Sequence, residues 1–246
     1  METPTPHVHV SSESAGRDRP LPLLHTPTHT CSYLPDRVAR LEVLLATPHD
    51  PGTYQALMDA RFRRNGVMFY RPDCPDCRAC VPIRVPVERF APSRSQRRAW
   101  RRNRDVRVEI GRPRGGDDRF ELYRRYQAFQ HDEHDDCDRD EFERFLCDTC
   151  IDTIEMAYYL GERLIGVGIV DVCPDALSSV YFYFEPAEAR RSLGVFSAMC
   201  EIDECRRRYR SYWYIGYWVQ GCAKMEYKSR FRPCELLGPD GVWRPG

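Results

Sequence analysis

The chain has 246 residues, of which 42% are hydrophobic and 30% are charged, and its 37 basic residues are balanced by 37 acidic ones. This length and composition exclude a chain that is disordered throughout, and they suit one large globular domain or two small ones. Because the net charge is zero, a general nucleic-acid coat protein is excluded, and any nucleic-acid binding must come from a local basic patch.

The N-terminal half of the chain is predicted to hold an extension, a helix and several short strands. Residues 1–30 are polar and rich in proline and histidine, which indicates a flexible extension. Apolar residues at helical spacing predict a helix over residues 54–62. The elements that follow are expected as strands at 67–70, 83–87 and 106–110 and as a basic helix at 93–103.

A glycine-rich segment at 111–116 is the best linker candidate in the chain. It separates a smaller N-terminal domain of residues 31–112, with the cysteine loop and the basic helix, from a C-terminal domain of residues 113–246. The second domain is expected to have helices at 120–130, 142–147 and after Ser192, and strands at 154–160, 164–172, 179–184 and 212–218. This order predicts an α/β (α+β) fold with an acyltransferase layout, in which the strand at 164–172, apolar on both faces, is central.

Three cysteines, Cys74, Cys77 and Cys80, follow one another at three-residue spacing between two expected strands. Such spacing lets successive thiolates face one point, which is typical of a zinc or Fe–S site, with Cys31 as a candidate fourth ligand. Packed or redox-sensitive thiols are the alternative, because Cys31 lies far away in the sequence. The acidic run at 131–138 lacks metal-ligand spacing and is interpreted as a solvated loop.

Two groups of basic residues are candidates for binding phosphates or carboxylates. The first is a one-sided stripe on the expected basic helix, formed by Arg94, Arg97, Arg98, Arg101 and Arg102. It suits contact with a phosphate backbone, and a solvated charged face is the alternative. The second group is the pair Lys224 and Lys228, the only lysines in a chain whose other basic residues are all arginine. Lysine at these two positions, in a chain that otherwise uses arginine, indicates that a compact ammonium group has a specific role there. The alternative is that the two lysines occur there by chance.

The segment from Arg191 to Gly194 is faintly similar to the pyrophosphate-binding turn of GNAT acetyltransferases. In that turn, backbone amides at a helix N-terminus hold a phosphate group. Phe196 stands where the pattern has a small residue, so tight coenzyme A binding is not expected. The same amides suit a phosphate or a 3′-terminal ribose.

Six segments taken together resemble the bacterial aminoacyl-tRNA–protein transferases, and most closely the aspartate/glutamate leucyltransferases. They are CSYLP, FRRNGVMFYRPDCPDCRACVPIRVPV, PSRSQRRAWRRN, SSVYFYFEP, RSLGVFS and YIGYWVQGCAKMEYKSRFRP, in this order along the chain. The resemblance covers residues 31–243, nearly everything except the N-terminal extension.

This resemblance implies transfer of leucine from leucyl-tRNA to proteins that begin with Asp or Glu, which marks them for degradation through the N-degron pathway. It also implies a GNAT-like catalytic domain that uses no acetyl-CoA. The family's cysteine region, associated with metal or Fe–S binding in eukaryotic relatives, corresponds here to Cys31, Cys77 and Cys80, with Cys74 as a further candidate.

We expect a cytoplasmic protein that does not bind a membrane. The twelve cysteines follow no apolar signal segment, which favours reduced thiols. No apolar run approaches the roughly 18–20 residues of a membrane span.

The implied reaction makes modest chemical demands on the protein. The donor ester is already activated, so the chemistry requires no cofactor and no ATP, and the sequence has no P-loop. The nucleophile is an α-amine with a pKa of about 7.7–8.0, so no dedicated strong base is expected. Holding the amine and the ester together lowers the barrier by ~7–11 kcal/mol in favourable cases, and hydrogen-bond donors at the developing oxyanion lower it further.

Candidate site residues follow from these demands. Contacts near the reacting ester are assigned to Tyr181, Tyr227 and the backbone amides from Ser192 to Gly194. The acidic side chain of the acceptor needs fixed cations, for which the candidates are Arg63, Arg64, Arg71, Arg84, Lys224, Lys228 and Arg230. The last three are equally candidates for the phosphates of the tRNA CCA end, and an internal ion pair is the alternative for each arginine.

Other functions stay open at this point. Arginyl transfer by the same mechanism is one of them. An ordinary N-acetyltransferase is a second, and the position of Phe196 speaks against it. A third is a metal-stabilised tRNA-binding module without catalysis, which needs only the cysteine loop and the basic helix.

Overall fold

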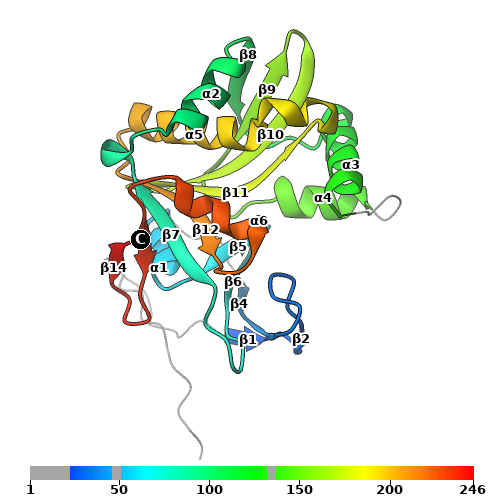
Figure 1. Ribbon diagram of the computed structural model, residues 1–246. Coiled ribbons are helices and arrows are strands. Elements are labelled where there is room, and N and C mark those ends of the chain that lie inside the picture. Colours follow the sequence, from blue (N-terminus) through cyan, green and yellow to red (C-terminus); the bar gives the residue numbers. More distant parts are fainter. Residues whose placement is uncertain (1–22, 46–50, 132–136) are drawn as a thin grey trace, which may run out of the picture.

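Two β-sheets and the helices that pack against them make up the protein in the computed structural model, which describes residues 23–45, 51–131 and 137–246 (Figure 1). The larger sheet consists of Val81–Pro86 (β7), Val106–Gly111 (β8), Thr153–Leu160 (β9), Arg163–Val172 (β10), Ala176–Phe184 (β11), Tyr212–Trp218 (β12), Glu235–Leu237 (β13) and Trp243–Pro245 (β14). Its strand order is β14-β13-β7-β12-β11-β10-β9-β8.

The smaller sheet lies in the N-terminal part of the chain. It consists of Leu23–His25 (β1), Leu41–Leu45 (β4), Arg63–Asn65 (β5) and Met68–Pro72 (β6), in the order β1-β4-β6-β5. His29–Thr30 (β2) and Val38–Ala39 (β3) form a separate two-stranded ladder. Residues 1–22, most of the expected extension, lie outside the described residues.

Six α-helices and three short 3₁₀ segments are found in the described part of the chain. The α-helices are Pro51–Asp59 (α1), Arg94–Arg102 (α2), Asp117–His131 (α3), Arg139–Leu146 (α4), Leu193–Arg207 (α5) and Ala223–Glu226 (α6). The 3₁₀ segments are Val87–Arg89 (η1), Pro186–Arg191 (η2) and Tyr227–Arg230 (η3). None of these described helices is both long and apolar enough to cross a membrane.

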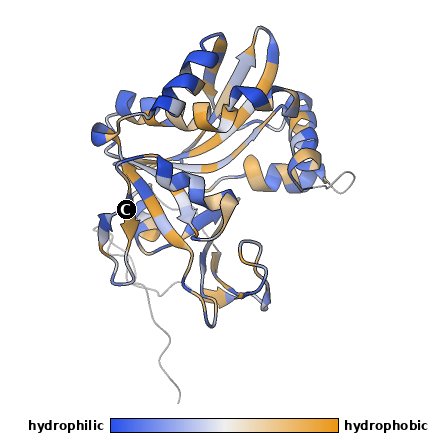
Figure 2. Ribbon diagram, viewed as in Figure 1, coloured by the Kyte–Doolittle hydropathy of each residue, from blue (hydrophilic) through white to orange (hydrophobic). Residues whose placement is uncertain are grey.

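The helices cover the two faces of the larger sheet. On one face, α5 packs its buried Phe196 and Ile202 against Trp213 of β12. On the other face, α3 and α4 pack against Val167 and Tyr183. The strands between them are largely hydrophobic, whereas α2, outside α5, is largely hydrophilic (Figure 2). The burial of both faces follows from the continuous apolar sequence of β10.

Several expected elements are confirmed by the structure. β10 is central among the C-terminal strands, between β9 and β11. α2 begins where the sequence indicates, because Ser93 accepts a hydrogen bond from the amide of Gln96 and the Gln96 side chain accepts one from the amide of Ser93. The predicted α/β fold is therefore correct.

Long-range pairing produces the differences from the sequence prediction. β12 is not the last strand, because β13 and β14 follow it and add to the same sheet. β7, from the N-terminal part of the chain, inserts between β12 and β13. The larger sheet thus includes strands from both sides of the expected linker at 111–116, and the division into two domains stays a prediction. Most of the acidic run, residues 132–136, lies outside the described residues.

The two middle strands of the larger sheet separate part-way along their length. β11 and β12 run parallel and pair only from Ala176 with Tyr212 to Ser178 with Tyr214. Just beyond that point, each strand has one extra residue relative to its other neighbour, Val180 in β11 and Ile215 in β12. Such bulges bend a strand and end its regular pairing. A gap therefore opens between the two strands.

A buried ion pair joins the smaller sheet to the larger one. The Arg64 guanidinium of β5 donates to both carboxylate oxygens of Asp171 in β10, at 2.9 and 2.6 Å. Thr153 donates a further hydrogen bond to the same carboxylate. Both side chains of the pair are almost fully buried. The pair is therefore fully hydrogen-bonded, as a buried pair of charges has to be.

Replacing Asp171 by Asn should strongly destabilise the fold, because it leaves the buried Arg64 charge without a counter-charge. We expect a loss of about 3–5 kcal/mol in the free energy of unfolding, measured by urea denaturation. Asp203→Asn is the control, since it breaks an exposed pair with Arg207 and should cost no more than about 1 kcal/mol. Equal effects of the two changes would contradict a structural role for the buried pair.

Candidate active site

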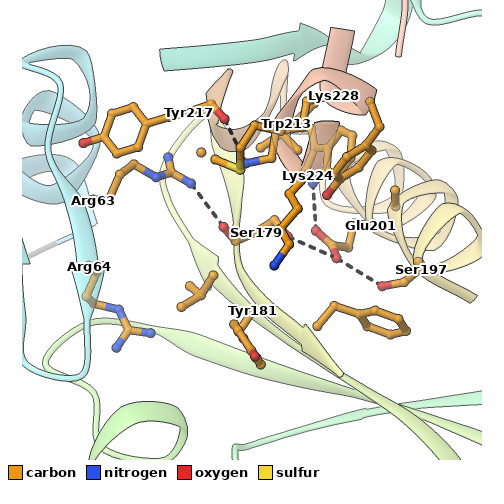
Figure 3. Close-up of a pocket in the computed structure, with 18 of the residues that line it drawn as sticks. Arg63, Arg64, Ser179, Tyr181, Ser197, Glu201, Trp213, Tyr217, Lys224 and Lys228 are labelled. Atoms are coloured by element: carbon orange, nitrogen blue, oxygen red, sulfur yellow. Dashed lines mark hydrogen bonds between the residues drawn. The ribbon is translucent and has the colours of Figure 1, made fainter. Parts of the chain in front are cut away.

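A cavity of about 390 Å³ lies where β11 and β12 diverge (Figure 3). Its walls come from β5, β11, β12, the N-terminal half of α5, and the segment of α6 and η3. The polar residues that matter most are Arg63, Ser179, Tyr181, Glu201, Lys224, Tyr227 and Lys228. The cavity at the point where the two strands separate is therefore lined by side chains from the N-terminal and the C-terminal parts of the chain.

Arg63 reaches the cavity from β5 as a buried cation. Its Nη2 atom donates to the carbonyl oxygen of Ser179 at 3.1 Å. That carbonyl lies just past the last residue of β11 that pairs with β12. Among the described residues, no carboxylate lies within ion-pair distance of Arg63. Its charge is therefore held in place by a neutral partner and stays available to an anion.

Lys228 is a second buried cation on the opposite side of the same gap. Its Nζ atom donates to the carbonyl oxygen of Tyr217 in β12 at 2.9 Å. Burial, reinforced by the nearby charge of Arg63, lowers the pKa of the Lys228 amine to about 7. In the described part of the chain, Lys228 forms no ion pair with a carboxylate.

Gly216 lies between these two cations and has a φ of +93°. A Cβ atom at this position would be 3.3 Å from Nζ of Lys228 and 3.7 Å from Nη2 of Arg63. Only glycine adopts this backbone conformation readily. The absence of a side chain here leaves the two charges close to one shared space.

The two remaining basic residues of the cavity differ from this pair. Arg64 lines it, but Asp171 already neutralises its charge. Lys224 is exposed and extends into the cavity from α6. Figure 3 shows Lys224 extending toward Ser179. Lys224 of α6 and Lys228 of η3 therefore line the same cavity.

Glu201 is the only carboxylate that lines the cavity among the described residues, and sequence analysis did not identify it. It projects from α5 and is 2% exposed. Trp213 donates its indole N–H to Oε2 at 2.8 Å, and Ser197 donates to Oε1 at 3.3 Å. Burial raises the pKa of this carboxyl to about 7, although these hydrogen bonds oppose the shift. One sequence signal was present, because Glu201 lies four residues after Ser197 on the apolar face of α5.

Three of the four residues assigned to the ester line the cavity, namely Tyr181, Gly194 and Tyr227. The fourth, Ser192, precedes α5 with a φ of +59°, and its side chain makes no capping hydrogen bond. It does not line the cavity. The N-terminal end of α5 therefore reaches the site through Gly194 rather than through Ser192.

Three of the arginines expected to bind the acceptor do not line the cavity. Arg71 pairs with Glu42, and Arg84 pairs with Glu235. Arg84 also lies between the rings of Tyr212 and Trp243. Arg230 is exposed at the end of η3. For Arg71 and Arg84 the structure supports the alternative of an internal ion pair.

The arginine stripe of α2 faces outward. Its members Arg94, Arg97, Arg98, Arg101 and Arg102 are all exposed. The helix is attached through Trp100, whose ring packs against that of Phe196 in α5 at 5.4 Å between centroids. This arrangement leaves the guanidinium groups open to solvent, so their contact with phosphates stays a prediction.

The four cysteines Cys31, Cys74, Cys77 and Cys80 do converge, around a small pocket of about 20 Å³. Tyr33 lines both this pocket and the larger cavity. However, no group of three or more His, Cys, Asp or Glu side chains in the described residues is placed to hold a metal ion. Burial and the three neighbouring thiols raise the pKa of the Cys80 thiol to about 12 in this metal-free cluster. As placed, these residues do not fit a zinc or Fe–S site.

Comparisons with known proteins agree with the resemblance noted in the sequence. Family models for the arginine-tRNA-protein transferase N terminus and C terminus match residues 29–98 and 118–238. The aspartate/glutamate leucyltransferase of Pseudomonas savastanoi pv. phaseolicola is 41% identical over 215 residues, covering 86% of this chain and 92% of that protein. The enzyme of the same name from Pseudomonas putida strain W619 is 42% identical with the same coverage.

A solved structure also shares the fold. The crystal structure of FemX aligns with a TM-score of 0.52 at 8% sequence identity. The alignment covers 88% of this chain and 86% of that one. Similarity at this level concerns the arrangement of the chain only.

The pKa of Lys228 is open to direct measurement, because the chain has only two lysines. In protein labelled with ¹³C at the lysine ε-carbon, we expect one signal to titrate with a midpoint near pH 7. The amine is charged below that pH and neutral above it. Lys228→Met should remove this signal, and Lys224→Met should leave it in place. A midpoint near the ordinary lysine value of about 10.4 would show that the amine is not desolvated.

Proposed function

The chain belongs to the family of arginine-tRNA-protein transferases and aspartate/glutamate leucyltransferases, and from this premise we propose that it transfers leucine from leucyl-tRNA to the N-terminal α-amine of proteins that begin with Asp or Glu. The protein is an aminoacyltransferase. The longer N-terminus that results is a degradation signal of the N-degron pathway. One observation supports the choice of acceptor above all, namely the two buried cations, Arg63 and Lys228, which pair with no carboxylate in the part of the chain that the structure describes.

Arg63 and Lys228 are suited to bind the acidic side chain of the acceptor. Two buried cations beside one another are unfavourable on their own, because each has lost hydration and they repel. A carboxylate placed between them supplies the missing counter-charge, and charge-assisted hydrogen bonds to it are strong. An acceptor that begins with Asn or Gln has the same shape without the charge, so it leaves both cations unpaired. Such unpaired groups make a site discriminate sharply.

The remaining cavity suits an apolar aminoacyl group. Val180, Phe182, Phe184, Ile215 and Met225 contribute to its lining. Leucine is compatible with such a wall, whereas an arginyl side chain would need acidic partners. Glu201 is the one carboxylate in the described lining, so an arginyl side chain would find a single acidic partner there.

The reaction forms one bond and breaks another. The neutral acceptor amine attacks the ester carbonyl carbon, the new C–N bond forms, and the bond from that carbon to the 3′-oxygen of the tRNA breaks. The tRNA leaves with a free 3′-hydroxyl group. The amide of Gly194 and the Tyr227 hydroxyl are our candidates for stabilising the negative charge on the carbonyl oxygen. We derive no step from a metal, because the cysteine cluster does not fit one.

The exposed arginines of α2 are our candidates for the tRNA backbone. They present several positive charges on one surface, which suits phosphates and carries no sequence information. Lys224, at the cavity itself, suits the phosphates of the CCA end. We also propose the cytoplasm as the place of reaction, in keeping with twelve cysteines that are all free thiols.

A donor screen tests the proposed function. Several charged tRNAs, including those for leucine, arginine and phenylalanine, are each incubated with a peptide that begins with Asp. We expect incorporation of leucine only. Preferential use of arginyl-tRNA would establish the alternative donor, and no transfer from any charged tRNA would refute an aminoacyltransferase function. Acetyl-CoA, added as a separate donor, should give no product.

The acceptor site is tested by removing each cation in turn. Lys228→Met and Arg63→Gln should each raise the KM for the Asp peptide by about 30-fold or more, the equivalent of ~2 kcal/mol. The preference for the Asp peptide over an Asn peptide should shrink by a similar factor, while tRNA binding stays unchanged. Arg163→Gln is the matched control, because that arginine forms an exposed ion pair with Glu188. Unchanged discrimination in both variants would exclude the cations from acceptor recognition.

A further inference from the structure

Glu201 has surroundings that are unusual for a buried carboxyl group. All its hydrogen-bond partners are neutral, namely Trp213, Ser197 and Ser179. No basic side chain in the described residues forms an ion pair with it. Burying a charge without a counter-charge is costly, so a carboxyl group in such a place calls for an explanation beyond packing. Groups of this kind are frequent at functional sites.

We propose that Glu201 is the catalytic base, which binds the α-ammonium group of the acceptor and takes up the proton that this group loses. The inference rests on the proposed function, because it presupposes an N-terminal amine in the cavity. It changes the expectation from sequence that no dedicated base takes part. The ammonium also provides the missing positive partner of the carboxylate.

Ser179 fixes the distance between the acidic and basic ends of the site. Its carbonyl oxygen accepts a hydrogen bond from Arg63 at 3.1 Å, and its hydroxyl lies 3.5 Å from Oε1 of Glu201. The Arg63 guanidinium and the Glu201 carboxylate thus contact two polar groups of the same residue. An N-terminal Asp has its carboxylate and its α-ammonium separated by only two carbon atoms. With its carboxylate on Arg63 and Lys228, its ammonium therefore extends toward Glu201.

The electrostatic surroundings permit the carboxyl to exchange a proton near neutral pH. The titratable groups that face it are Tyr158 from β9, Cys200 and Cys205 from α5, Tyr227 from η3 and Lys224 from α6 across the cavity. β10, β11 and β12 face it with Gly168, Ser179 and Trp213, which carry no charge. Burial brings the pKa of Glu201 to about 7, close to the roughly 7.7–8.0 of an α-amine. A base works best when its pKa lies near the working pH.

The protons balance as follows. The acceptor nitrogen begins with three protons as an ammonium group. One passes to the Glu201 carboxylate, which makes the amine neutral and able to attack the ester carbon. A second passes to the departing 3′-oxygen as the carbon–oxygen bond breaks. The third stays on the nitrogen of the new amide, and Glu201 releases its proton to solvent before the next cycle.

Glu201→Gln tests this role with a side chain of the same shape. At pH 7 and saturating Asp peptide, we expect the single-turnover rate to fall by at least about 10²-fold, which is in the usual range for loss of a general base. At pH 9 the acceptor amine is already neutral, so the deficit should shrink to within about tenfold. Binding of the charged tRNA and the KM for the peptide should be little changed.

Two further variants keep the test independent of folding. Trp213→Phe retains the carboxylate but removes the donor that favours its charged form, so the low-pH limb of the rate profile should move to higher pH. Asp203→Asn, on the outer side of the same helix, should behave like the wild type. Thermal unfolding of each variant verifies that it is folded.

The outcomes separate this inference from the proposed function. A wild-type chain that transfers no aminoacyl group refutes both. A chain that transfers leucine while Glu201→Gln is as fast as the wild type refutes the inference alone. A deficit of equal size at pH 7 and pH 9 would assign Glu201 a structural role, and loss of preference for charged over uncharged tRNA would assign it to the donor's ammonium group.

Discussion

The site depends on one feature of the larger sheet: the parallel strands β11 and β12 are hydrogen-bonded over only a short stretch. Where β11 and β12 separate, backbone carbonyl groups lose the partners that a continuous ladder would supply. Arg63 donates to the carbonyl oxygen of Ser179 on one strand, and Lys228 donates to that of Tyr217 on the other. The same separation that opens the cavity thus positions its two buried cations.

The cavity combines charges of both signs, in an arrangement that suits the acceptor we propose. Arg63 projects from β5 of the smaller sheet and Lys228 from η3, whereas Glu201 projects from α5. An N-terminal acidic residue also carries both signs, and it can satisfy both ends of the site at once. In our proposal, binding the acceptor's carboxylate to the two cations also places its ammonium group beside the base. Little further machinery is needed, because the donor ester is already activated.

Local features of the chain were readable from the sequence, whereas partnerships between distant residues were not. α2 could be placed because Ser93 and Gln96 cap it within a few residues, and β10 because its own side chains are apolar on both faces. The insertion of β7 beside β12 depends on pairing across more than a hundred residues. Arg63 and Arg71 look equivalent in sequence, and only the fold shows that Glu42 neutralises one of them. Glu201 escaped notice because it belongs to no motif.

The walls of the site have a consequence for how the chain can be divided. Arg63 belongs to the segment that matches the N-terminal family model, while Ser179, Glu201 and Lys228 belong to the segment that matches the C-terminal one. Neither segment alone contains a complete set of charges. With the roles proposed for these residues, neither of two separately produced fragments would hold a complete site. Activity of the chain would therefore report that its N-terminal and C-terminal segments are assembled.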